Sequence, residues 1–74
     1  MNTLDIKKLL QSEFPNSDIE VSGEGCKFTV AIISDIFKGK NRVQRQRLVN
    51  NVLKKHLESG TIHAVSIIAK APGE

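Results

Sequence analysis

Arg42–Ala69 reads RVQRQRLVNNVLKKHLESGTIHAVSIIA, and this stretch decides the fold. As far as Ser59, apolar residues recur at the three- and four-residue spacing of a helix that buries one stripe, formed by Leu48, Val49, Val52, Leu53 and Leu57. Gly60 is typical of the residue that ends a helix. Thr61–Ala69 is apolar on both faces, which predicts a final strand that is central in its sheet or covered. The stretch therefore predicts a helix over Arg42–Ser59 followed at once by a strand.

Upstream of this stretch the sequence predicts one helix and two strands. Apolar residues at helical spacing cover Thr3–Phe14, with Thr3 as the expected N-cap. The pattern changes to period two over Asp18–Ser22, and Lys27–Ser34 is rich in β-branched and aromatic residues. Gly23–Gly25 joins these strands into an antiparallel hairpin. We expect an α+β fold of one domain (residues 1–74) in the order αββαβ, a three-stranded sheet with helices packed on one face.

Two segments are expected to lack regular structure. Asp35–Asn41 is largely polar and contains Gly39, which is typical of a surface connection. Pro72–Glu74 is expected to be a frayed tail.

The composition excludes several classes of protein. Of the 74 residues, 39% are hydrophobic and 26% are charged, as in an ordinary globular chain. The longest apolar run, Val30–Ile33, is far shorter than the roughly 20 residues of a membrane-spanning helix. The N-terminus has no export signal, and the single Cys26 cannot form an internal disulfide, so we expect a cytoplasmic protein with no membrane partner. The sequence contains no HExxH, CxxC, GxSxG or Walker motif, so we expect no enzyme.

Positive charge is concentrated in one segment. Between Ile36 and Leu57 there are seven lysines and arginines and no acid, although the net charge of the chain is only +3. Five of these cations lie within ten positions: Lys38, Lys40, Arg42, Arg45 and Arg47. One interpretation is a solvated helix face, and the other is recognition of an anion, including duplex DNA whose groove takes a helix. Phe37 is the only nearby aromatic residue, which counts against stacking on single-stranded nucleic acid.

Three side chains are potential metal ligands: Cys26, His56 and His63. His56 lies in the last turns of the second helix, where a cation favours the helix dipole, so we expect it to act as a cap. Cys26 is either a small apolar residue at a strand start or a ligand. His63 interrupts an apolar strand, so its imidazole must be satisfied by a hydrogen bond or a ligand. Cys26 and His63 cannot close a tetrahedral site alone, but a thiolate and an imidazole can supply half of a zinc or iron–sulfur site shared with a partner.

Three ordered motifs resemble those of the BolA-like proteins. Phe37–Val49 (FKGKNRVQRQRLV) resembles the F-x-G-K…V-x-R-H-R-x-V signature of the family, with Gln46 where many members have histidine. Ile62–Ile67 (IHAVSI) resembles its closing I-H-A-L/V-S-I strand. Val21–Gly25 (VSGEG) is similar to the loop of the shorter, IbaG-like branch. The resemblance covers essentially the whole chain.

The resemblance implies a class II KH-like fold and a non-enzymatic partner of monothiol, CGFS-type glutaredoxins. In that family the heterodimer holds a bridging [2Fe-2S] cluster together with glutathione and takes part in iron–sulfur cluster assembly, trafficking or iron sensing. His63 matches the family's strand histidine, which is a cluster ligand. Cys26 lies in the loop region that supplies the second ligand. The isolated chain is then expected to hold no cofactor, as a monomer or weak homodimer.

The resemblance also leaves two roles open for the basic segment. In the first, the basic helix binds the glutaredoxin or its anionic glutathione. In the second, the protein is a transcriptional regulator that contacts DNA, as some BolA proteins are described to do, through Arg42, Arg45, Arg47 and the nearby lysines.

Overall fold

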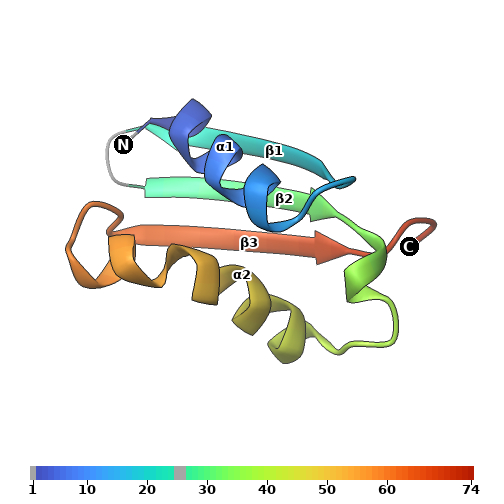
Figure 1. The fold of residues 1–74 in the computed structure, drawn as a ribbon. Helices are drawn as coiled ribbons and strands as arrows, with labels where there is room; N and C mark the ends of the chain where they lie inside the picture. The colour runs from blue at the N-terminus through green and yellow to red at the C-terminus, as the bar shows by residue number, and fades with distance from the viewer. Residues whose placement is uncertain (1, 25–26) are drawn as a thin grey trace.

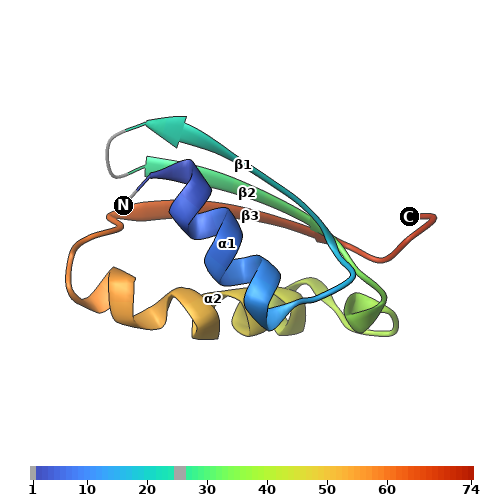
Figure 2. The same ribbon diagram turned by 45° about the horizontal axis from the view of Figure 1, so that its top comes forward.

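A computed structural model describes residues 2–24 and 27–74 of the chain, with the elements in the expected αββαβ order. The elements are α1 (Thr3–Glu13), β1 (Asp18–Glu24), β2 (Lys27–Ile33), the short 3-10 helix η1 (Asp35–Phe37), α2 (Arg42–Glu58) and β3 (Ala64–Lys70). The strands form one sheet in the order β1-β2-β3, with β1 antiparallel and β3 parallel to β2. Figures 1 and 2 show α1 and α2 on the same face of this sheet, as the sequence predicts.

Helix α1 starts one residue earlier than the expected cap. Asn2, and not Thr3, is the N-cap: its side chain accepts a hydrogen bond from Asp5 N at 2.9 Å. The Asp5 carboxylate accepts one from Asn2 N at 3.1 Å in return, which completes a capping box. Thr3 is a good N-cap by residue type, but Asn caps a helix at least as well. Asn2 also lies three residues before the acidic Asp5, which is the spacing that a capping box needs. The helix buries Ile6 and Leu10 against the sheet.

The core lies between the sheet and the two helices. Side chains of β2 alternate between buried and exposed, and Phe28, Val30 and Ile32 point toward the helices. Helix α2 adds Val49 and Leu53, which are fully buried members of the expected stripe.

The connection between β2 and α2 carries a core residue that its polar composition concealed. Phe37 ends η1 with no exposed surface, and its ring lies 6.1 Å from that of Phe14 at a tilt of 45°. Phe37 is therefore unavailable for stacking on a nucleotide base. Helix α2 then begins with a second capping box, in which the side chains of Asn41 and Gln44 each bond to the backbone N–H of the other.

The expectation of a central or covered β3 is wrong. Strand β3 lies at the edge of the sheet next to β2, and only the face of β3 that carries Val65, Ile67 and Ala69 packs against the core. On the other face Ile68 keeps half of its surface exposed. An apolar pattern reports the residue types on each face, but the position of a strand in the sheet depends on its crossover. Here the β2–α2–β3 crossover places β3 beside β2 at an edge, with no described helix over its second face.

Candidate functional site

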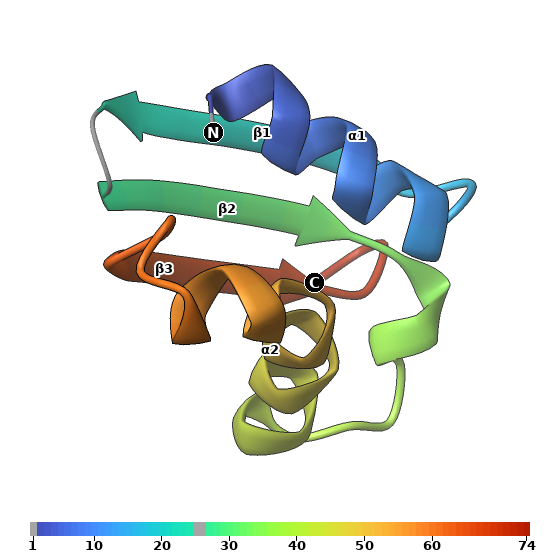
Figure 3. The same cartoon turned by 60° about the vertical axis from the view of Figure 1, so that its left-hand side comes forward.

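The candidate site residues fall at opposite ends of the sheet. At one end the first residue of β2, Lys27, pairs with the first residue of β3, Ala64, so the start of β2 lies beside the start of β3, which His63 directly precedes. Figure 3 shows this end, where β2 and β3 begin side by side. The basic residues lie before and within the first turns of α2, beside the ends of β2 and β3. Seven residues of strand separate the two ends by about 20 Å.

His63 lies outside β3, in the bend immediately before it. Its neighbour Ile62 is 1% exposed and donates a backbone hydrogen bond to His56 O at 3.0 Å, which fixes the connection to the end of α2. His63 itself is exposed, and its Nε2 lies 3.9 Å from the point where a Cβ on Gly60 would sit. The prediction that His63 interrupts an apolar strand is therefore wrong. Its imidazole meets water and is open to a ligand from outside the chain.

The second expected ligand, Cys26, lies outside the described residues. In the flanking strands, Gly23 pairs with Phe28 and Glu24 pairs with Lys27. Within residues 2–24 and 27–74, no group of three or more His, Cys, Asp or Glu side chains is arranged to hold a metal ion. The described part of the chain thus offers one exposed imidazole, His63, at this end of the sheet.

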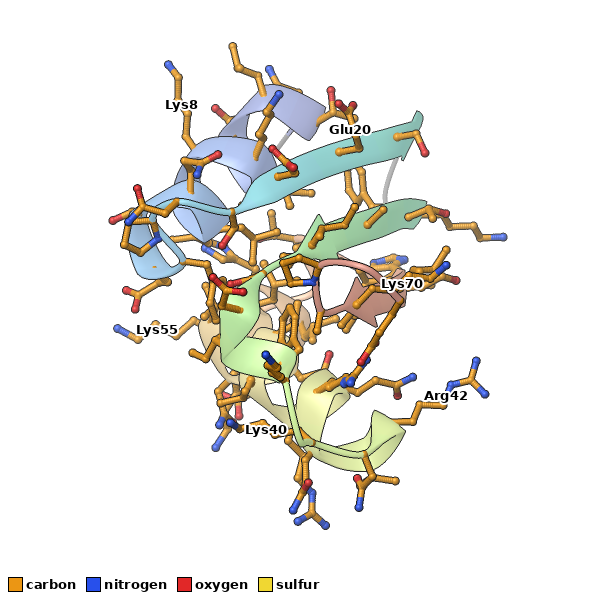
Figure 4. The ribbon with its side chains drawn as sticks, turned by 90° about the vertical axis from the view of Figure 1, so that its right-hand side faces the viewer. Lys8, Glu20, Lys40, Arg42, Lys55 and Lys70 are labelled. Carbon is orange, nitrogen blue, oxygen red and sulfur yellow. The ribbon has the colours of Figure 1, made fainter. Side chains whose placement is uncertain are left out.

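Three of the five basic residues are exposed cations on or near the start of α2: Lys38, Arg42 and Arg47. Lys40 is half-buried, and its Nζ donates to Ile36 O at 2.9 Å, across the turn that follows η1. Figure 4 shows Lys40 and Arg42 on either side of the start of α2. Arg42 and Arg47 are five positions apart, so they project about 140° apart around the helix axis. The cations surround this end of α2 and do not line one face.

The Arg45 guanidinium forms its hydrogen bonds and an ion pair within the chain. Its Nε donates to Lys40 O at 2.8 Å and its Nη1 to Ala69 O at 3.1 Å, while the guanidinium forms a bidentate pair with the Glu74 carboxylate at 2.5 and 2.8 Å. The hydrogen bonds from Arg45 and from Ala71 N lower the pKa of Glu74 to about 2. The hydrogen bond from Glu74 raises the pKa of Arg45. Arg45 therefore joins α2, β3 and residues 71–74.

The expectation of a frayed tail at Pro72–Glu74 is wrong for the same reason. Glu74 accepts hydrogen bonds from Arg45 and from Ala71 N, and Ala71 is 3% exposed.

Beside the Arg45–Glu74 pair lies an open hollow of about 320 Å³, lined by Arg42, Gln46 and the last four residues of β3 among others. Arg45 and Glu74 are 29 positions apart, and no local pattern in the sequence links them. Sequence reasoning could have identified Glu74 only as the one acid after fifteen acid-free positions, Ser59–Gly73, of mixed strand and loop.

Comparison with known proteins identifies the class and then the family. The αββαβ order and the mixed three-stranded sheet define a class II KH-like fold. BolA1 from Arabidopsis thaliana matches it with a TM-score of 0.86 at 32% identity over 100% of this chain and 96% of BolA1. The BolA domain of SufE1 from the same plant matches with a TM-score of 0.85 at 35% identity, over 95% and 91% of the two chains.

The sequence comparisons agree with the structural ones. The acid stress protein IbaG of Escherichia coli is 34% identical over all 74 residues of this chain, which cover 88% of IbaG. A family model described as BolA-like protein matches residues 11–74. The chain belongs to the BolA-like family. Among the described residues, no helix is long and apolar enough to cross a membrane.

Proposed function

We propose that this protein is a non-enzymatic adaptor of iron–sulfur metabolism that binds a monothiol, CGFS-type glutaredoxin and shares a [2Fe-2S] cluster with it. Membership of the BolA-like family is consistent with a role in iron–sulfur biology. The observation that carries the specific proposal is the exposed His63, held beside the start of β2 by the Lys27–Ala64 pairing. An imidazole at the rim of a sheet can enter the coordination sphere of a partner's iron without any change in the fold.

The residues at this end fit a shared cluster and do not fit a resident one. A [2Fe-2S] cluster takes four protein or small-molecule ligands, and the described residues place His63 alone at the site. Cys26 is the proposed second ligand from this chain, and glutaredoxin and glutathione supply the others. A bound cluster accepts and releases electrons and can pass between proteins. This chain's part is to hold the His63 imidazole in place through the buried Ile62 and the first residues of β3.

The basic residues are too far from His63 to hold the glutathione of such a complex. Ala64 and Lys70 are separated by the length of β3, about 20 Å, and α2 begins beside the Lys70 end, as Figure 1 shows. Lys54 and Lys55, in the last turns of α2, are exposed cations nearer to His63. The proposal therefore assigns contact with an anionic group beside the cluster to these two lysines, and not to Lys38–Arg47.

The test compares the two histidines of the chain in complex with cluster-loaded glutaredoxin. We expect His63→Ala to change the visible absorption and circular dichroism of the cluster, because one ligand is exchanged or lost. His56→Ala is the matched control, because His56 lies in the last turn of α2 and accepts the hydrogen bonds of Ile62 and Ser59 through its backbone carbonyl. Cys26→Ser tests the second ligand in the same assay. Identical spectra for His63→Ala and wild type would reject His63 as a ligand.

A second candidate function, DNA binding, rests on the exposed Lys38, Arg42 and Arg47 at the start of α2. Arg45 is left out of this surface because Glu74 already pairs with it. With three free cations we expect weak duplex binding whose logarithmic affinity falls with the logarithm of salt at a slope of about −3 or less steep. Fluorescence anisotropy with duplex DNA, on wild type and Arg42→Glu, measures this slope. If Arg42→Glu leaves this slope unchanged, the surface at the start of α2 does not bind DNA.

A further inference from the structure

The hollow beside the Arg45–Glu74 pair carries more positive charge than its one acid neutralises. Arg42, Arg45 and Lys70 line it, and Glu74 is the single acid among its lining residues. Arg42 and Lys70 are exposed, and neither forms an ion pair within the part of the chain that the structure describes. Figure 4 shows Arg42 and Lys70 on one side of the molecule and Lys8, on α1, on the other. A hollow with two unneutralised cations favours an anionic occupant.

Glu74 shows how this hollow binds a carboxylate. Its two oxygens accept the paired hydrogen bonds of the Arg45 guanidinium, and one of them also accepts a bond from Ala71 N at 3.2 Å. The pKa of Glu74 is lowered to about 2, first by the hydrogen bond from Arg45, then by that from Ala71 N, and also by the nearby charges of Arg45 and Lys70. Lys70 therefore acts electrostatically within the same hollow, where its ammonium is available to a second carboxylate.

The hollow also reaches the free edge of β3. Lys70 O accepts a hydrogen bond from Ser34 N, on the β2 side of the strand. Ala69 O points to the other side and accepts one from Arg45 Nη1. Because alternate residues of a strand direct their backbone groups to the same side, Ile67 directs its N–H and C=O away from β2. Ile67 lines the hollow, and among the described residues no hydrogen bond reaches these two outward groups.

The edge of β3 lacks the protection that sheet edges usually have. Charged side chains on an edge strand discourage pairing with another chain, and the opposite edge strand, β1, carries Asp18 and Glu20. Among the seven residues of β3 only the last, Lys70, is charged. The inward-facing side chains of β3 are only half-buried, whereas Phe28, Val30 and Ile32 of β2 are buried. An added strand would cover this exposed apolar surface and bond to the free backbone groups.

We propose that the hollow and the adjoining edge of β3 form a docking site for an extended acidic peptide of a partner protein, which adds to the sheet as a fourth strand. The peptide backbone bonds to the outward groups of Ile67. Two consecutive acidic residues, whose side chains point to opposite faces of the added strand, pair with Arg42 and Lys70. Arg45 ends the pairing, because its guanidinium already bonds to Ala69 O. No iron–sulfur cluster takes part in this contact.

The test measures binding of a labelled peptide to the full chain by fluorescence anisotropy at low salt. The probe is Asp-Asp-Ile-Thr-Ile-Asp-Asp with both ends capped, so that either strand direction brings an acidic pair to the hollow. We expect Arg42→Gln and Lys70→Gln each to weaken binding about threefold, because each removes one exposed ion pair. Glu74→Gln should tighten binding about threefold, since it removes the carboxylate that repels the peptide. Lys8→Gln removes the same charge from α1, away from the hollow, and should leave the affinity unchanged.

A second peptide separates strand addition from simple attraction of charges. It keeps the four acids and replaces Ile-Thr-Ile by Pro-Pro-Pro, which has no backbone N–H to donate, and it should bind at least tenfold more weakly. Equal binding of the two peptides would reduce the hollow to a plain anion site and overturn the proposal. So would the absence of binding, an equal loss from Lys8→Gln and Lys70→Gln, or a chain whose own self-association excludes the peptide from the edge. Circular dichroism of each variant checks that the fold is retained.

Discussion

Gly23 lies near the end of β1, opposite Phe28 and beside the candidate site, and Gly23→Ala should destabilise the folded state. Its φ is +124°, and an added Cβ would lie 2.3 Å from Lys27 O and 2.9 Å from Phe28 Cα. Both are backbone atoms of β2, so no side chain can move aside. The strained φ costs about 1–3 kcal/mol, and loss of one ladder hydrogen bond adds about 0.5–1.5 kcal/mol. We expect Gly23→Ala to lower the free energy of unfolding by about 3 kcal/mol.

Gly39→Ala is the matched control for this substitution. Gly39 also has a positive φ, +78°, but nothing lies within 4 Å of its added Cβ, so only the left-handed backbone cost of about 1–2 kcal/mol remains. Urea unfolding followed by far-UV circular dichroism measures both values, since the chain has no Trp or Tyr for fluorescence. A domain of this size has roughly 4–11 kcal/mol of stability, so both variants should fold. Equal losses of unfolding free energy for the two variants would refute the claim that the close approach of the β2 backbone adds to the cost of Gly23→Ala.

Three further predictions concern the caps, the core and the Arg45–Glu74 pair. Asn41→Ala removes the side-chain acceptor of the α2 capping box and should cost about 1 kcal/mol in urea unfolding. Leu53→Ala, at a fully buried position, should cost about 2–5 kcal/mol, whereas Val43→Ala, at a position 58% exposed on the same helix, should stay within about 0.5 kcal/mol; similar losses would contradict the assigned core. Because the pKa of Glu74 is lowered from 4.5 to about 2, its contribution is present above pH 4.5 and lost as the pH falls toward 2. The stability difference between wild type and Glu74→Gln should therefore be constant at neutral pH and vanish near pH 2, and a difference that persists there would refute the pair.

The order of elements could be predicted because it is encoded in local periodicity. Helical spacing around Ile6 and Val49 and the alternation in β1 and β2 report which side chains face a core, and the structure confirms these faces. The antiparallel hairpin follows from the short glycine-containing connection. These are properties of neighbouring residues, and they need no knowledge of the rest of the chain.

Apart from the N-cap of α1, which Asn2 provides in place of Thr3, the errors concern contacts between segments that are not adjacent in the sequence. The edge position of β3 depends on the β2–α2–β3 crossover, and the ordered tail depends on the contact of Glu74 with Arg45. The burial of Phe37 depends on Phe14, which follows α1 near the start of the chain. At the candidate site, the sequence identified His63 by residue type and family resemblance, but its position in an exposed bend comes from the anchoring of Ile62.

The central claim is that the end of the sheet with His63, and not the end with the basic residues, receives the glutaredoxin and its cluster. A titration of the ¹⁵N-labelled protein with cluster-loaded monothiol glutaredoxin, followed by amide chemical shifts, tests it most directly. We predict that the largest changes fall at Lys27 and at His63–Ala64, with smaller ones at Lys54 and Lys55, while Lys38–Arg42 stays unperturbed. Changes concentrated at Lys38–Arg42, or no changes at all, would contradict the account.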